Sequence, residues 1–104
     1  AWDGIADIEF SIDPSFAISE SAIGLVTDVV EELISNAVRH GSAKRISVVV
    51  GAQGSDVKVT FHDDGTEMKS GKKGLGSEIL KKQTLTYDYE RNSEGNQIVI
   101  TLPN

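Results

Sequence analysis

The side chains of Glu32, Asn36 and His40 recur at intervals of four within residues 29–41, whose apolar positions follow the period of an α-helix. Residues four apart lie one above another on a helix, so the three form one polar file along the border of the apolar stripe. The adjacent Glu31 falls on the solvent side. A helix that needs only to be soluble does not require Asn at the border of its core face. The file therefore indicates a functional site, although alone it also fits an ordinary helix with polar edges.

A second candidate is Asp63, which ends a segment that alternates like a strand. The apolar side chains at alternate positions of residues 57–61 share one face, and Asp63 continues that face while Asp64 points away. A carboxylate at the end of a buried face is costly without hydrogen-bond donors. The exocyclic amine of a ligand base would be a suitable donor, and Gly65 leaves room for its approach. The alternative is that Asp63 only caps a turn.

Residues 71–76 are rich in glycine and directly precede a predicted helix start. Glycines permit a tight backbone, and the first N–H groups of a helix can receive phosphate oxygens. Lys72 and Lys73 add positive charge there. The segment alone equally fits a flexible connection. It is not a Walker loop, because the Gly-Lys-Ser/Thr ending is missing, and it lacks the spacing of a dinucleotide-binding fingerprint.

These candidate residues must be positioned by the elements around them. At 104 residues the chain is long enough for one domain with one core. Alternation and turn residues predict strands at 5–12, 45–51, 56–63, 84–90 and 97–102, with hairpin turns at 51–55 and 91–96. Helices are predicted from an N-cap at Ser19 or Ser21 to Gly41, and from about Leu75 to Gln83. This order predicts an α+β fold, a two-layer α/β sandwich whose mixed, mostly antiparallel sheet is covered on one face by helices.

Composition limits the classes of function. The formal net charge of −6 argues against a nucleic-acid surface, which usually shows as a basic patch, but does not exclude a nucleotide. The chain has no cysteine, which fits a reducing compartment, and no signal-peptide pattern or apolar run of membrane-spanning length. It begins without Met, so we expect a single domain, residues 1–104, excised from a longer protein.

Taken together, the three motifs resemble those of the GHKL ATPases, the superfamily of gyrase, Hsp90, histidine kinases and MutL. Glu32-x-x-x-Asn36-Ala37 resembles their N box, Asp63-Asp64-Gly65 their first glycine box, and Gly74-Leu75-Gly76 their second. The resemblance spans about residues 22–103. Within the superfamily, the sequence of residues 32–46 most resembles the catalytic ATP-binding domain of sensor histidine kinases of the DesK-like and nitrate-sensor subfamily. This resemblance implies the Bergerat ATP-binding fold.

The resemblance also implies a role for each residue of the helix. Asn36 would hold the Mg²⁺ ion that bridges the ATP phosphates, and Asn36 and Glu32 would be the catalytic residues. Glu32 would order the water shell of the Mg²⁺ ion or accept a proton. Arg39 and His40 would lie near the phosphates.

The two glycine boxes would hold the rest of the nucleotide. Asp63 would accept a hydrogen bond from the adenine amine, with Gly65 packed against the base. Residues 66–73 would form a mobile lid, and Gly74, Leu75 and Gly76 would shape the helix N-terminus at the phosphates. The reaction would be γ-phosphoryl transfer, in which positioning and charge neutralisation dominate.

The sequence departs from the family pattern at three places, one of which is the short segment after Leu80. Thr66-Glu67 follows Gly65 where many relatives have a further glycine, and the last strand has Gly95-Asn96 in place of Gly-Thr. Two alternatives remain open. One is an anti-sigma-factor serine kinase, and the other is a non-catalytic nucleotide-binding interaction module of the same fold.

For the leading hypothesis we expect a histidine protein kinase domain that does not autophosphorylate alone. Its partners would be its own or a partner's dimerisation and phosphoacceptor domain, and a response regulator downstream. We expect no nucleic-acid partner. The domain would be cytoplasmic, with membrane attachment only through the parent protein.

Overall fold

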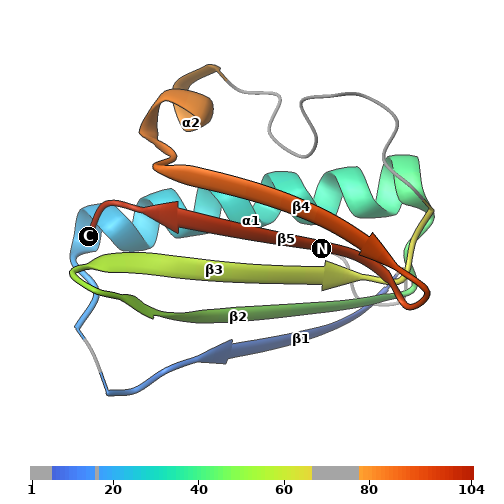
Figure 1. Ribbon diagram of the computed structural model, residues 1–104, viewed down its shortest axis with the longest axis horizontal. Coiled ribbons are helices and arrows are strands. Elements are labelled where there is room, and N and C mark those ends of the chain that lie inside the picture. The colour runs from blue at the N-terminus through green and yellow to red at the C-terminus, as the bar shows by residue number, and fades with distance from the viewer. Residues whose placement is uncertain (1–5, 16, 67–77) are drawn as a thin grey trace.

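One long helix lies across one face of a five-stranded sheet (Figure 1). The computed structural model describes residues 6–15, 17–66 and 78–104. The elements follow in the order β1 (Asp7–Ile12), α1 (Glu20–Gly41), β2 (Arg45–Gln53), β3 (Asp56–Asp63), α2 (Glu78–Gln83), β4 (Thr86–Asn92) and β5 (Gly95–Leu102).

The sheet has the strand order β1-β2-β3-β5-β4. β1 pairs parallel with β2, and α1 forms the crossover that a parallel pair requires. The other three pairs are antiparallel. α1 packs on β3 and β5, and α2 contacts α1. The predicted two-layer α/β sandwich with a mixed, mostly antiparallel sheet is therefore confirmed.

The core lies between α1 and the inner face of the sheet. The apolar stripe of α1 and every second residue of the three central strands are buried, as a helix period of 3.6 and a strand period of 2 require. The fully buried side chains include Val29, Leu33, Val48, Val50, Val57, Val59, Phe61, Ile98, Ile100 and Leu102.

Both ends of α1 have a local cause. The hydroxyl of Ser19 accepts a hydrogen bond from the backbone N–H of Ala22 at 3.1 Å, which makes Ser19 the N-cap, one of the two residues predicted for it. The helix ends at Gly41 as predicted. Ser42, rather than a glycine, takes the left-handed conformation of the C-cap, with φ 54°.

Strand boundaries differ from the prediction in β1, β2, β4 and β5, and β1 begins at Asp7. β2 continues to Gln53, because the turn that follows is made by Gly54 with φ 62°. β4 begins later than predicted, at Thr86. Its hairpin with β5 is tighter than predicted, because β4 extends to Asn92 and β5 begins at Gly95. The sequence had placed residues 91–96 in a turn because Asn, Ser and Gly are typical of turns. The start predicted for the second helix, near Leu75, lies outside the described residues.

Candidate functional site

Asp63 is fully buried at the end of β3, where it faces the helical layer as the alternation predicted. Its Oδ1 accepts two hydrogen bonds, from the backbone N–H of Gly65 at 2.8 Å and from Asn96 Nδ2 at 3.0 Å. Its Oδ2 is also buried and has no hydrogen-bond partner among the described residues. A buried carboxylate oxygen without a donor carries a desolvation cost, so it needs an explanation by function or by a ligand.

Asn96 lies directly opposite Asp63 in the pairing of β3 with β5, and only 1% of its surface is exposed. Its Oδ1 accepts hydrogen bonds from the hydroxyl of Tyr89 at 2.6 Å and from Arg91 Nη1 at 2.9 Å. Its Nδ2 also donates to the carbonyl of Thr66 at 2.8 Å. Asn96 thus connects β3, β4, β5 and the segment after β3.

The sequence reasoning missed Asn96 as a site residue because it placed this position in a turn. A signal was present, since Ile98, Ile100 and Leu102 share the inner face of β5 and Asn96 continues that face towards its start. The same period of two identified Asp63.

Asp64 points away from the core and is exposed, as predicted. Its Oδ1 accepts hydrogen bonds from the backbone N–H groups of Arg45, at 3.0 Å, and Lys44, at 2.7 Å. The bond from Arg45 is the main cause that holds the pKa of Asp64 below its usual value, and the bond from Lys44 adds to it. Asp64 therefore joins the beginning of β2 to the end of β3 and belongs to the scaffold of the site.

Gly65 lies where α1 and β3 end together. A Cβ atom at Gly65 would lie 2.6 Å from the carbonyl oxygen of Gly41 and 2.9 Å from Asp63 Oδ1. The backbone N–H of Thr66 donates to the same Gly41 carbonyl at 2.8 Å. Glycine is needed at position 65 for this close approach of helix and loop, whatever a ligand requires. The end of the helix that carries the polar file is thus fixed beside the Asp63 loop.

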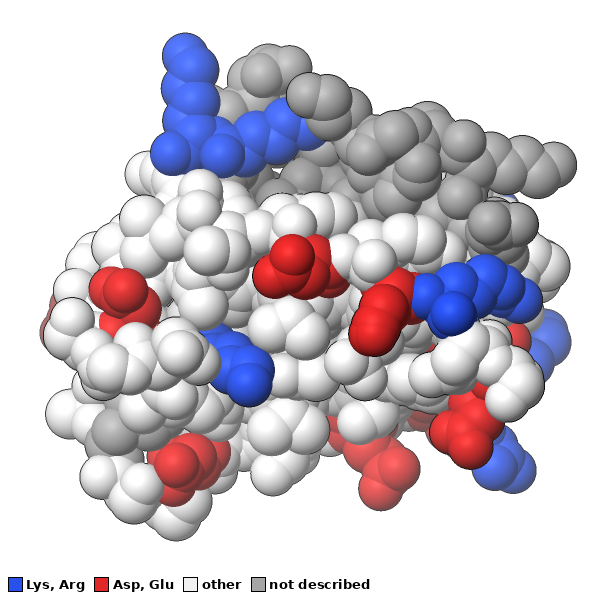
Figure 2. Space-filling view, in the orientation of Figure 1, with Lys and Arg blue, Asp and Glu red and all other residues white. Residues whose placement is uncertain are grey.

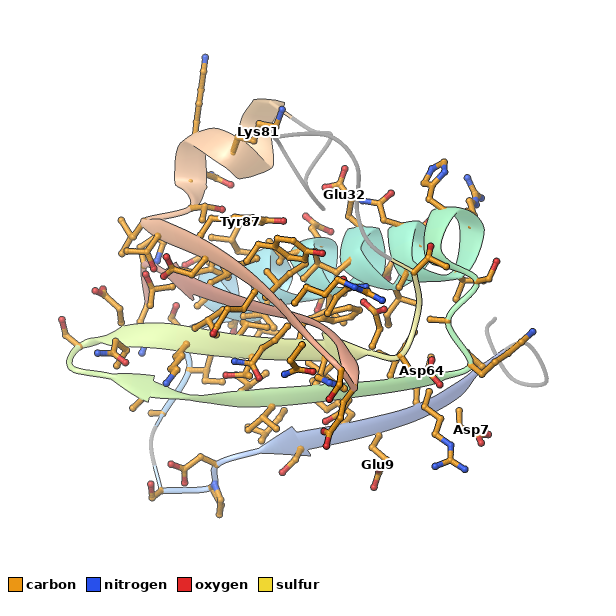
Figure 3. All side chains as sticks on the ribbon, turned by 45° about the vertical axis from the view of Figure 1, so that its right-hand side comes forward. Asp7, Glu9, Glu32, Asp64, Lys81 and Tyr87 are labelled. Carbon is orange, nitrogen blue, oxygen red and sulfur yellow. The ribbon has the colours of Figure 1, made fainter. Side chains whose placement is uncertain are left out.

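The polar file on α1 divides by exposure. Glu32 and Asn36 are half-buried, whereas Glu31, Arg39 and His40 are exposed. Figure 3 shows Glu32 extending from α1 on the side of α2. Arg39 and His40 stand in the last turn of α1, where positive charge complements the helix dipole.

The structure brings part of the predicted site together. The contacts of Gly65 and Thr66 with the Gly41 carbonyl place the loop after Asp63 at the end of α1, the helix whose last turn carries Arg39 and His40. Gly74, Leu75 and Gly76 lie outside the described residues, as does the predicted lid beyond Thr66.

Tyr87 lies on β4 with its side chain on the inner face, in register with the buried Ile100 (Figure 3). The residue is half-buried, and its hydroxyl is buried without a hydrogen-bond partner among the described residues. Burial is the main cause that raises the pKa of Tyr87, and the neighbouring Tyr89 adds to the effect. Tyr87 and Tyr89 thus form an aromatic pair on the inner face of β4.

Charge on the described surface is mixed. In Figure 2, Lys and Arg side chains gather over α2, and acidic and basic side chains are interspersed over the sheet. Among the described residues, no three His, Cys, Asp or Glu side chains form a group that could hold a metal ion by themselves. Within the same residues, no helix combines the length and apolar character needed to cross a bilayer.

Residues 22–104 match the family described as "Histidine kinase-, DNA gyrase B-, and HSP90-like ATPase". The chain belongs to this ATPase family. The match covers α1, the Asp63 loop and the strands that hold Asn96. The predicted relationship to the GHKL ATPases is therefore confirmed, and nucleotide binding is the activity common to a domain of this family.

Comparison with individual proteins places the domain near sensor histidine kinases. It is 28% identical over 102 residues to the nitrate/nitrite sensor protein NarX of Escherichia coli K12, covering 90% of this chain and 17% of NarX. The fold is similar to that of the histidine kinase AdeS of Acinetobacter baumannii, with a TM-score of 0.70 and 14% identity, covering 95% of this chain and 54% of AdeS. It is also similar to the histidine kinase ThkA in complex with the response regulator TrrA, with a TM-score of 0.59 and 16% identity, covering 92% of this chain and 34% of that one. The chain thus spans a small part of the length of NarX, and it has the fold of the histidine kinases AdeS and ThkA.

Proposed function

We propose that this domain binds Mg-ATP and supplies the γ-phosphate to a histidine side chain on a separate dimerisation helix. The observation that carries the proposal is the hydrogen bonding of the Asp63 carboxylate. One of its oxygens is held by two donors of the protein, and the other is buried with no donor among the described residues. In a domain of an ATPase family, the 6-amino group of adenine is a donor that fits this oxygen.

The polar file on α1 would take the phosphate part of the nucleotide. Asn36 and Glu32 offer an amide oxygen and a carboxylate one helical turn apart, and Mg²⁺ prefers such hard oxygen ligands. Two such ligands leave most of the six positions around Mg²⁺ open, so the ion would be shared with the ATP phosphates. When bound, Mg²⁺ neutralises charge on the phosphate oxygens. We assign Asn36 as its ligand and Glu32 as the acid beside it.

Arg39 and His40 follow Asn36 on α1 and stand in the last turn of the helix, where both side chains are exposed. We assign them, together with Gly74, Leu75 and Gly76, to the phosphates. Phosphoryl transfer needs positioning and charge neutralisation more than covalent chemistry from the enzyme. An imidazole nitrogen of the acceptor histidine would bond to the γ-phosphorus while the bond to the bridging oxygen breaks and ADP leaves.

The acceptor histidine would come from another domain. His40 is exposed on α1 and His62 is half-buried on the outer face of β3, and we assign neither as the acceptor. The chain spans 17% of the length of NarX, and we propose that it is one domain, residues 1–104, of a longer protein. Its partners would be the dimerisation and phosphoacceptor domain of its own or a second chain, and a response regulator, as ThkA has in TrrA. It would work in the cytoplasm, with any membrane attachment through the parent protein.

Titration with ATP in the presence and absence of Mg²⁺ tests the proposal. We expect Asn36→Ala to lose the Mg²⁺-dependent part of the affinity, with ATP binding weakened about tenfold or more, since one ligand to the ion is removed. Glu32→Gln should weaken Mg-ATP binding as well. Glu31→Gln makes the same change one residue away on the exposed face, so it should bind as the parent does. If Asn36→Ala binds Mg-ATP as tightly as the parent, the assignment of the α1 file is wrong.

A further inference from the structure

Asp63 and Asn96 form a polar pair inside an apolar core. Among the described residues, Asp63 and Asn96 are the two buried polar side chains, and they lie opposite each other on neighbouring strands. Arg91 of β4 lies opposite Asn96 in turn, so three polar side chains form one row across β3, β5 and β4. The next two rows hold apolar and aromatic side chains, with Phe61, Ile98 and Tyr89 in one and Val59, Ile100 and Tyr87 in the other.

The orientation of the Asn96 amide is fixed by its neighbours. Arg91 can only donate a hydrogen bond, so the Asn96 atom 2.9 Å from Nη1 must be the amide oxygen. The hydroxyl of Tyr89 then donates to the same oxygen. The NH₂ group is left on the other side, where it donates to Asp63 Oδ1 and to the carbonyl of Thr66.

This orientation decides what Asp63 can bind. Both protein groups that contact Oδ1 are donors, the Asn96 amide and the Gly65 backbone N–H. Oδ1 is thereby filled, the carboxylate is held in one orientation, and Oδ2 is left as an acceptor. A purine with a 6-amino group would donate to Oδ2. A purine with a 6-carbonyl would bury its carbonyl oxygen against Oδ2, and because both atoms are acceptors this contact is strongly unfavourable.

We infer that Asn96 is a positioning residue that sets the nucleobase selectivity of this domain, favouring 6-amino purines over 6-carbonyl purines. It acts through Asp63 and not by touching the nucleotide. Without the Asn96 donor, Oδ1 keeps only the Gly65 backbone N–H, and the carboxylate is held less firmly in the orientation that presents Oδ2 as an acceptor. The inference rests on the proposed function, since it requires that ATP binds beside Asp63.

The first test needs no variant. The chain is titrated with Mg-ATP, with Mg-ITP, which has a carbonyl in place of the 6-amino group, and with the Mg complex of purine riboside triphosphate, which has a hydrogen there. We expect ATP to bind about 100-fold tighter than ITP, with the 6-hydrogen analogue between them. If ITP binds as well as the 6-hydrogen analogue, Asp63 is not held as an acceptor and the inference is overturned. If ATP itself does not bind, the proposed function is wrong, which is a different outcome.

The second test isolates the donor at position 96. Asn96→Thr and Asn96→Val introduce side chains of the same shape, both suited to a strand, that differ in one hydroxyl group. We expect Asn96→Val to lose about tenfold or more of the ATP-to-ITP affinity ratio and Asn96→Thr to retain more of it. The melting temperature of each variant without nucleotide reports the purely structural role of the residue. Equal affinity ratios in the Thr variant, the Val variant and the parent would overturn the inference even if both variants were less stable.

Discussion

At the scale of single residues, the site depends on how closely the chain packs around Asp63. Gly95, at the start of β5, has φ 132°, a conformation that side chains other than glycine rarely adopt. A Cβ atom there would clash with the carbonyl oxygen of Asp63. The turn glycine thus lets β5 begin beside Asp63, which in turn places Asn96 opposite the carboxylate.

The substitution Gly95→Ala should therefore destabilise the domain. We expect the free energy of unfolding to fall by about 2–4 kcal/mol, because both the positive φ and the contact with the Asp63 carbonyl oppose a methyl group. Urea unfolding followed by circular dichroism measures it. Gly51→Ala is the control, since nothing lies within 4 Å of a Cβ at that position, and it should change the free energy of unfolding by about 0.5 kcal/mol or less. A Gly95→Ala variant as stable as the parent would contradict the geometry described for the hairpin.

Sequence reasoning reached Asp63 and failed at Asn96 for one physical reason. The alternation of the strand before Asp63 is unbroken, so the direction of its side chain follows from a period of two. Asn96 stands beside Gly95 in a run of turn-forming residues, and only the pairing of β5 with β3 shows that the strand has already begun there. That pairing is a long-range contact that local patterns do not contain.

At the scale of elements, the ends of α1 and β3 are fixed to each other and to the start of β2. Thr66 donates to the Gly41 carbonyl at the end of the helix, and Asp64 accepts from the two backbone N–H groups of Lys44 and Arg45. The loop that carries Asp63 is therefore held from both sides. The sequence predicted that Asp64 points away from the core, but not that it binds the β2 start, since the partner lies nineteen residues away along the chain.

This bracing predicts a pH dependence. The pKa of Asp64 is lower in the folded domain than in the unfolded chain. The charged carboxylate therefore stabilises the fold at a pH above the usual aspartate pKa, and this stabilisation is lost as the pH falls towards the lower pKa of the folded state. We expect Asp64→Asn to be less stable than the parent at pH 7, by about 1 kcal/mol or less because the group is exposed. Unfolding in urea at pH values from 7 down to 3 should show this difference shrinking below about pH 4. A difference that stays constant across the range would contradict this role of the charged carboxylate.

The edge strand β1 shows a further limit of sequence patterns. Ile8, Phe10 and Ile12 share a face as predicted, and their register with β2 places that face on the side of α1. Phe10 and Ile12 nevertheless remain 52% and 50% exposed. Alternation reports which side of a strand is apolar, but the extent of burial depends on how far the covering helix reaches.

At the scale of the whole molecule, two patterns with different periods place polar side chains on neighbouring elements of the sandwich. The file on α1 follows the helical period and Asp63 follows the strand period, and the proposed site needs both elements. The α/β sandwich brings them together because α1 packs on β3 and β5 and ends beside the Asp63 loop. Fold class and element order could be predicted from the sequence, whereas the polar row of Asp63, Asn96 and Arg91 required the order of the strands in the sheet.

The central claim is that this end of the sandwich binds ATP through Asp63. Calorimetric titration of Mg-ATP into the parent, Asp63→Asn and Asp64→Asn tests it most directly, because the two variants make the same change at adjacent residues on opposite faces of the chain. In Asp63→Asn, the new NH₂ group must oppose either the Asn96 and Gly65 donors or the adenine amine, so we expect binding to weaken about 100-fold or more. Asp64→Asn should bind within about twofold of the parent. A folded Asp63→Asn variant, with the melting temperature of the parent, that binds Mg-ATP as tightly as the parent would contradict the account.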